Sequence, residues 1–125
     1  MCLVYQVKTS CFFSTHQYRK FLCFILLIVV GGSVWAGNAR GKITSIIVRD
    51  SDGLVYVNVE GRANKPDCAV GNYMIIKNEN SATGKRQLAL LLMAQAANKV
   101  ISVTGYGTCT RWPDGEDINY ILVEK

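Results

Sequence analysis

The segment Thr108–Asp117, with the sequence TCTRWPDGED, contains the densest group of side chains suited to ligand binding. Pro and Gly stand at the second and fourth positions of Trp112–Gly115, which is typical of a type I turn. The ring of Trp112 could stack on the apolar face of a sugar, while Arg111, Asp114 and Asp117 would supply directional hydrogen bonds. In the alternative interpretation, Trp112 is a lid that closes the open end of the domain.

Three further side chains are of types that bind rings. Tyr56 and Asn58 lie on the outward face of an expected strand, and Tyr106 ends another. Aromatic and amide side chains on a β surface can hold a saccharide, but they also form ordinary cross-strand pairs. We group these three with Arg111, Trp112 and Asp114 as candidate ligand-binding residues.

Groups suited to catalysis are scarce. The last histidine is His16, so no Ser-His or Cys-His pair can form in the rest of the chain. Asp114, Glu116 and Asp117 are neighbours in one loop, whereas the paired acids of glycoside hydrolases flank a cleft from separate elements. With two cysteines and no histidine downstream, a metal site lacks ligands as well. We therefore expect a protein that is not an enzyme and that has no metal or cofactor.

Cys68 and Cys109 are the two cysteines that follow the N-terminal segment. An even number of cysteines in an exported chain predicts a disulfide bond. The bridge would close a loop of about 40 residues, which stabilises a fold by on the order of 4 kcal/mol if only chain entropy is counted.

Residues 1–36 are typical of an export signal. Two basic residues precede the ten apolar residues Phe21–Val30, and small side chains at positions 34 and 36 predict cleavage after Ala36. The alternative is an uncleaved membrane anchor, although Gly31-Gly32-Ser33 interrupts the roughly 20 apolar residues that a spanning helix needs. Residues 37–125 then form one domain, secreted or periplasmic, with membrane contact only through an uncleaved leader.

The charge of this expected domain is close to balanced. The whole chain has 14 Lys and Arg, 9 acids and a formal net charge of +5. Three of the cations and none of the acids lie in residues 1–36, so eleven cations face nine acids in the remainder, a net charge of about +2. Phosphate binding needs clustered Lys and Arg, so we expect no nucleic-acid partner.

Apolar periodicity predicts three strands, a helix and two more strands. The expected strands are 42–49, 54–60, 72–77, 99–106 and 118–124, and the expected helix is 84–97. Ser81 or Thr83 can cap the start of the helix, and Asn98 can end it in a left-handed conformation. This order predicts a mainly β fold, a five-stranded antiparallel barrel of the oligonucleotide/oligosaccharide-binding (OB) type. An open α+β sheet is the alternative.

The expected helix, 84–97, is apolar nearly all round. A helix that covers a barrel normally has a polar outer face. Its second apolar face therefore favours contact with another copy of the chain in a homo-oligomer. Alternatively, Ala89, Ala94 and Ala97 expose only small methyl groups to water.

Several short motifs together resemble a known group of proteins. They are Gly41-Lys42-Ile43, Cys68, the helix start Gly84-Lys85, and Lys99-Val100 leading to Gly105 and Cys109. With the element order, they resemble small exported bacterial proteins related to the B subunits of subtilase-cytotoxin- and pertussis-like toxins. The resemblance covers nearly all of residues 37–125. It implies an OB-type barrel, assembly into a ring of five, glycan binding on host cells and a separate enzymatic A subunit.

These observations predict an exported, non-catalytic binding module whose partner is a glycan or a protein. The toxin-like reading makes it a glycan-binding subunit. The alternative is a stand-alone periplasmic protein that binds or inhibits another protein.

Overall fold

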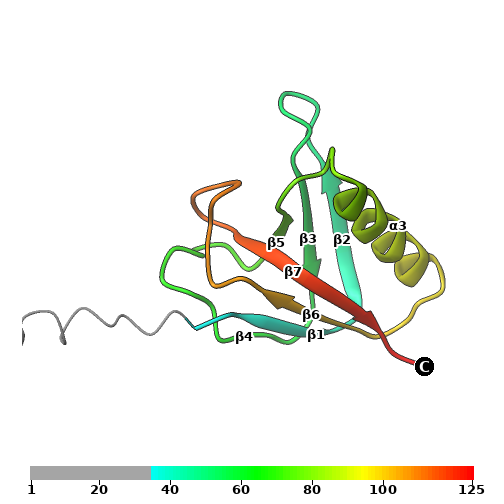
Figure 1. Ribbon diagram of the computed structural model, residues 1–125. Helices are drawn as coiled ribbons and strands as arrows, with labels where there is room; N and C mark the ends of the chain where they lie inside the picture. Colours follow the sequence, from blue (N-terminus) through cyan, green and yellow to red (C-terminus); the bar gives the residue numbers. More distant parts are fainter. Residues whose placement is uncertain (1–34) are drawn as a thin grey trace, which may run out of the picture. The chain divides into compact units, whose positions relative to one another are not determined.

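The computed structural model describes residues 35–125, which form a curled β-sheet with one helix (Figure 1). The expected leader therefore lies outside the described residues, apart from its last two, Trp35 and Ala36. In chain order the elements are β1 (Asn38–Gly41), β2 (Ile43–Val48), β3 (Val55–Val59), β4 (Arg62–Ala63), β5 (Met74–Ile76), α3 (Ala82–Ala96), β6 (Ile101–Gly105) and β7 (Glu116–Val123). No helix in this part of the chain is both long and apolar enough to cross a bilayer.

The strands pair in the order β2-β3-β5-β7-β6-β1-β4. All neighbours are antiparallel except β5 and β7, which run parallel, with Met74 beside Glu116 and Ile76 beside Ile118. This pair is parallel because α3 and β6 separate β5 from β7 in the chain, and the β6–β7 hairpin places β7 beside β5 in the same direction. The start of β7 therefore lies in the middle of the sheet.

The mainly β fold with one helix is confirmed, but the five-stranded antiparallel barrel is wrong. The sheet has seven strands and is mixed. Residues 38–41 precede the first expected strand, yet they form strand β1 because their backbone pairs with both β6 and β4. Backbone pairing of this kind leaves no periodic apolar pattern in the sequence, which is also why the two-residue β4 was missed.

The curl of the sheet follows from the short joint between β1 and β2. These strands lie near opposite ends of the pairing order, yet Lys42 alone connects them. At this joint the backbone N–H of Glu60 donates to the carbonyl of Lys42, with N and O 3.0 Å apart. The sheet closes over a core that α3 completes: Ala39, Val55, Val57, Val59, Met74, Ile76, Leu91, Ala94, Ile101, Val103 and Ile118.

In the first hairpin, formed by β2 and β3, one face of β3 points into the core. Val55, Val57 and Val59 are buried, and the turn at Asp50–Gly53 closes with the N–H of Arg49 donating to the carbonyl of Leu54. Gly53 has a φ of +73°, a conformation that favours glycine. Asp and Gly residues are typical of hairpin turns, so the local sequence is sufficient to explain this one.

Helix α3 is capped as the sequence predicts. The side chain of Ser81 accepts a hydrogen bond from the N–H of Gly84 at 2.9 Å, and Asn98 follows the helix with a φ of +52°. One face is buried through Gly84, Gln87, Leu91 and Ala94, and packs against β2, β5 and β7. Figure 1 shows α3 running along one side of the sheet next to β2.

Cys68 and Cys109 form the predicted disulfide, with their Cα atoms 6.1 Å apart. The bond links the loop that follows β4 to the loop between β6 and β7. Both loops lack regular hydrogen-bonded structure over most of their length, so the bond holds together two segments that the sheet does not.

Removing this bond should lower stability markedly. We expect the double substitution Cys68→Ser/Cys109→Ser to reduce the free energy of unfolding by about 4 kcal/mol, because the unfolded chain regains the entropy of an open loop. Urea denaturation of both proteins measures the difference. A reducing agent should lower the free energy of unfolding of the wild type to that of the variant and should not change that of the variant. Alkylation of both thiols in the unreduced protein would contradict the bond.

Candidate functional site

The loop between β6 and β7 is held by the buried carboxylate of Asp117. One oxygen accepts hydrogen bonds from the backbone N–H and the hydroxyl of Thr110 at 2.8 and 2.6 Å, and from the hydroxyl of Thr108. The other accepts from the N–H of Arg111 at 3.0 Å. Burial acts to raise the pKa of Asp117, but these hydrogen bonds outweigh it and hold the pKa below its usual value.

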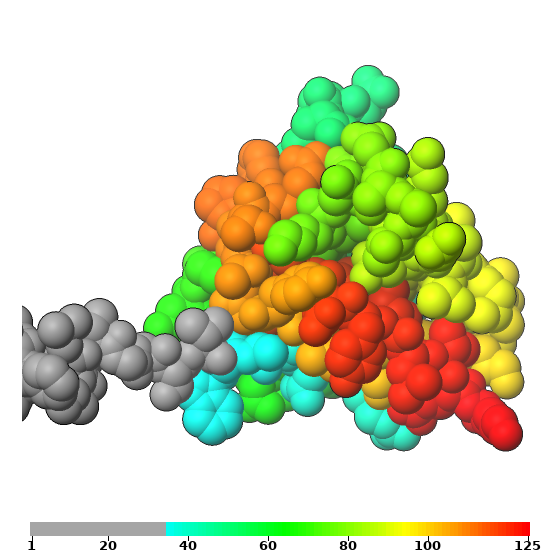
Figure 2. Space-filling model, viewed as in Figure 1, coloured from blue at the N-terminus to red at the C-terminus, as the bar shows by residue number. Residues whose placement is uncertain are grey.

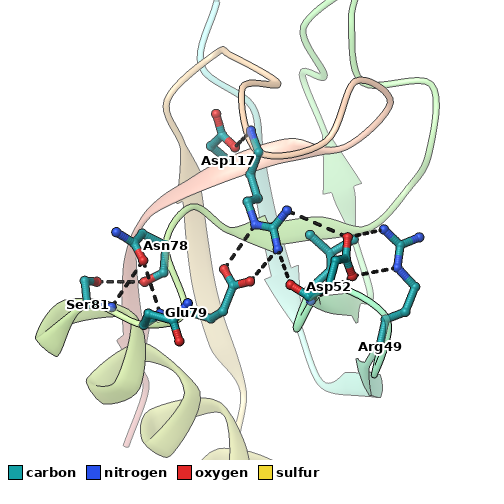
Figure 3. Close-up of polar contacts among 9 residues, drawn as sticks. Arg49, Asp52, Asn78, Glu79, Ser81 and Asp117 are labelled. Atoms are coloured by element: carbon teal, nitrogen blue, oxygen red, sulfur yellow. Dashed lines mark hydrogen bonds and ion pairs between the residues drawn. The ribbon is translucent and has the colours of Figure 1, made fainter.

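The side chain of Arg111 joins this loop to the first hairpin and to the segment before α3. Its guanidinium donates to both carboxylate oxygens of Glu79 and to the carbonyl of Asp52, the latter at 2.9 Å. Figure 3 shows Glu79 and Asp52 on two sides of this guanidinium, with Arg49 beyond Asp52. The hydrogen bond from Arg111 lowers the pKa of Glu79, and that from Arg49 lowers the pKa of Asp52 to about 2.

The aromatic residues near this network contact one another and its charges. The guanidinium of Arg49 lies 4.1 Å from the ring centroid of Trp112. Tyr73 donates its hydroxyl to Asp114, and the rings of Tyr73 and Tyr56 lie 5.1 Å apart. Burial and the bond to Asp114 raise the pKa of Tyr73 to about 12. Trp112 and Asp114 are both half-buried by these contacts.

Five of the six predicted binding residues contact neighbours in this network or across the β2–β3 pair. Arg111, Trp112, Asp114 and Tyr56 come together in the network just described, whereas the amide of Asn58 donates to the hydroxyl of Ser45 across the β2–β3 pair. Whether any of them also binds a ligand stays a prediction. Their mutual contacts agree with the alternative interpretation, in which Trp112 acts as a lid.

The sixth residue, Tyr106, borders a pocket of about 250 Å³ between the end of β5, the start of α3 and β7. Its lining combines one aromatic ring with amide, hydroxyl and ammonium groups: Lys77, Asn78, Ser81, Thr83, Gly84, Gln87, Tyr106, Ile118 and Asn119. The segments that carry these residues meet on the face shown in Figure 2, where green, orange and red adjoin. The volume is slightly below the roughly 300–1,000 Å³ of common ligand pockets, so it suits a single ring.

The polar groups of the pocket are held in place. Gln87 is buried, and its amide N–H donates to the backbone carbonyl of Asn119 at 3.0 Å. The side-chain oxygen of Asn78 accepts a hydrogen bond from the backbone N–H of Ser81, and the backbone carbonyl of Asn78 accepts one from the Ser81 hydroxyl. A Cβ at Gly84 would lie 2.0 Å from that carbonyl, so only glycine lets α3 approach so closely.

The side chains that line the pocket include one cation and no anion. None of its nine lining residues is acidic, and α3 presents its N-terminal end to it. The partial positive charge of a helix N-terminus favours an anion there. The ammonium of Lys77 adds a full charge, 4.5 Å from the ring centroid of Tyr106.

Our sequence analysis missed Lys77, Gln87 and Asn119. One signal could have revealed Gln87, because Gly84, Gln87, Leu91 and Ala94 follow the helical repeat of the buried face, and a polar residue in that stripe needs a partner. Lys77 and Asn119 carry no comparable signal. They meet only because β5 and β7 are parallel neighbours, a pairing that the residues themselves do not predict.

Among residues 35–125, no group of three or more His, Cys, Asp and Glu side chains could hold a metal ion. Comparison of the chain with protein-family models, curated proteins and solved structures gave no significant match. The functional argument therefore depends on the geometry of the pocket.

We expect Asp117→Asn to destabilise the protein by about 1–3 kcal/mol at pH 7, because an amide cannot accept all of the hydrogen bonds that the carboxylate receives. Since the folded-state pKa of Asp117 is lowered, its contribution is present above the unfolded pKa of about 4 and disappears as the pH falls through the folded value. The stability gap between the two proteins should therefore narrow at low pH.

Urea denaturation at pH 7 and in steps down to pH 2 tests this prediction. The matched control is Asp67→Asn, which alters an exposed carboxylate and should leave stability within about 0.5 kcal/mol. A gap of constant size at every pH would contradict the role given to the charge of Asp117.

Proposed function

We propose that this protein is an exported, non-catalytic module that binds one ring of an acidic saccharide in the pocket beside Tyr106. The observation that carries the proposal is the make-up of the pocket. An exposed aromatic ring stands beside convergent amide, hydroxyl and ammonium groups in a hollow of about 250 Å³. Sugars have apolar ring faces and hydroxyl edges, and this lining is complementary to both.

The groups have distinct roles in this proposal. The ring of Tyr106, which is 46% exposed, provides the stacking surface. Gln87, fixed by its hydrogen bond to the backbone carbonyl of Asn119, presents its side-chain oxygen to sugar hydroxyls, and the side chain of Asn119 borders the pocket beside it. The hydroxyls of Ser81 and Thr83 border the opposite side.

The charge of the pocket supports an acidic ligand. The contact between Lys77 and Tyr106 is exposed, and cation–π contacts of this kind contribute only about 0.5–1 kcal/mol. A hydrogen bond from an ammonium to a carboxylate contributes about 1.5–3 kcal/mol. A ligand carboxylate would therefore draw the ammonium from the ring face, which a sugar could then occupy.

Two features of the sequence support the wider setting. The leader at residues 1–36 supports export, and the resemblance to toxin B subunits supports a glycan of a host cell as the ligand. Neither bears on the choice of pocket, which depends on the geometry alone.

The proposal predicts that Tyr106→Ala weakens saccharide binding and leaves the fold intact. A glycan array identifies the ligand, and calorimetry on the best acidic glycan measures the loss of affinity, which we expect to be up to about tenfold because an aromatic stacking contact contributes about 0.5–1.5 kcal/mol. The matched control is Tyr120→Ala, since Tyr120 is 53% exposed on β7 and does not line the pocket. Equal binding by all three proteins would contradict the proposal.

Lys77→Gln tests the acidic character of the ligand. Affinity for the acidic glycan should fall by about tenfold or more, while affinity for its neutral analogue should not change.

Trp112→Ala distinguishes binding in this pocket from binding at the loop predicted from the sequence. If Trp112→Ala weakens binding and Tyr106→Ala does not, the ligand lies at the loop instead.

The outer face of α3 favours a second candidate function, self-association or binding of another protein. Leu90, Leu92 and Met93 are 38%, 51% and 46% exposed, and Figure 2 shows the helix, green to yellow, on the surface of the domain. Apolar side chains at this exposure on one helix are typical of an interface. This face would serve the homo-oligomer expected from the sequence.

Light scattering of the exported protein tests the second candidate. An oligomer that dissociates in Leu92→Lys/Met93→Lys, and stays intact in the exposed polar control Gln95→Lys, would support it. A monomeric wild type would exclude self-association through α3 and leave only a foreign protein as its partner.

A further inference from the structure

A second buried carboxylate, Glu116 at the start of β7, faces the N-terminal end of the folded unit. One of its oxygens accepts hydrogen bonds from the backbone N–H groups of Gly37 and Gly107, both at 2.8 Å. Its other oxygen forms an ion pair with Arg62, whose side chain is 5% exposed. Glu116 itself is 0% exposed. The carboxylate is therefore shared between one guanidinium and two amide groups.

Gly37 fits this place tightly. Its carbonyl accepts the N–H of Gly105 at 2.8 Å, so both ends of the residue are held. A Cβ at position 37 would lie 2.2 Å from Glu116 Oε2 and 2.7 Å from the carbonyl of Asn64. Only glycine can bring its nitrogen so close to the carboxylate.

The burial changes abruptly at this residue. Gly37 is buried, whereas Ala36 is exposed and Trp35 is 71% exposed. Strand β1 begins at the next residue, Asn38. The folded unit therefore starts at the nitrogen of Gly37. The leader pattern predicts cleavage between Ala36 and Gly37, which is the peptide bond to this nitrogen.

We propose that hydrolysis of the Ala36–Gly37 bond during export places the new α-ammonium of Gly37 against the buried carboxylate of Glu116, so that removal of the leader locks the N-terminus. The inference rests on the export that is part of the proposed function. A signal peptidase acts on the extended chain before folding. Water adds to the carbonyl carbon of Ala36, and the bond between this carbon and the nitrogen of Gly37 breaks. The leader leaves with a C-terminal carboxylate. The nitrogen of Gly37 keeps the electron pair of the broken bond and takes up protons to become an ammonium.

The change strengthens a contact that is already present. In the uncut chain the nitrogen of Gly37 is a neutral amide donor 2.8 Å from Glu116. After hydrolysis it is a charged donor, and charge-assisted hydrogen bonds are about twice as strong as neutral ones. Arg62 repels the ammonium and reduces the gain. However, Arg62 binds the other oxygen of the carboxylate, not the one that faces the nitrogen of Gly37.

The test compares two exported proteins, each expressed as the full chain with its leader. One is the wild type, and the other carries a serine inserted between Ala36 and Gly37. The insertion leaves the amide of Gly37 in place but moves the ammonium one residue away from Glu116. Intact mass spectrometry first establishes the N-terminus of each. We expect wild-type chains of residues 37–125 and variant chains with one additional serine.

The α-amine of each mature protein is then titrated by NMR. An ordinary α-amine has a pKa of about 7.7–8.0, and a carboxylate in contact should raise that of the wild type by roughly 1 unit or more above that of the insertion variant. Below pH 7 the wild type should melt about 4–8 °C higher. Because the folded-state pKa is the raised one, this difference is lost as the pH rises through it.

Three outcomes would overturn the inference: a mature chain that starts elsewhere, equal pKa values for the two amines, or equal melting temperatures at pH 6–7. None of these bears on Tyr106 or its pocket. Conversely, absence of saccharide binding would leave the docking of the Gly37 ammonium unaffected, so the two proposals fail separately.

Discussion

The structure depends on two consecutive buried carboxylates, Glu116 and Asp117, at the start of β7. Successive side chains of a strand point to opposite faces, so the two carboxylates serve different parts of the chain. Glu116 binds Gly37 and Arg62 on one side, and Asp117 binds Thr108, Thr110 and the backbone of Arg111 on the other. Segments that are remote in sequence are thereby positioned from one point in the middle of the sheet.

The ion pair between Arg62 and Glu116 favours one arrangement of the strands over others more than it adds to the free energy of unfolding. Desolvation of a buried ion pair largely cancels its attraction, so the bond between Arg62 and Glu116 is weak evidence for a stable fold. Loss of either partner alone would nevertheless be costly, since the other would remain buried and uncompensated. The pair thus penalises any structure in which β4 and the N-terminal segment fail to reach β7.

The same strand determines where a ligand could bind. Immediately after the two carboxylates, Ile118 and Asn119 line the pocket next to the start of α3. Asp117 also organises the loop whose residue Arg111 binds Glu79, so the segment leading into α3 is held from two directions. The pocket is therefore built on rigid elements, whereas Trp112 and Asp114, the residues most suggestive in the sequence, contact Arg49 and Tyr73 within the chain.

Local patterns in the sequence determined the elements whose partners lie close by. The hairpin with its Val face, the cap at Ser81, the end of α3 at Asn98 and the disulfide could all be predicted, because turn chemistry, helix periodicity and cysteine pairing are visible in a single chain. The sequence also marked Tyr106, although not what surrounds it. Only the tertiary structure decided the rest: the strand character of 38–41, the parallel pairing of β5 with β7, and the meeting of Lys77, Gln87 and Asn119. Each of these depends on backbone hydrogen bonds or packing between distant segments, and such contacts leave no local pattern from which they can be predicted.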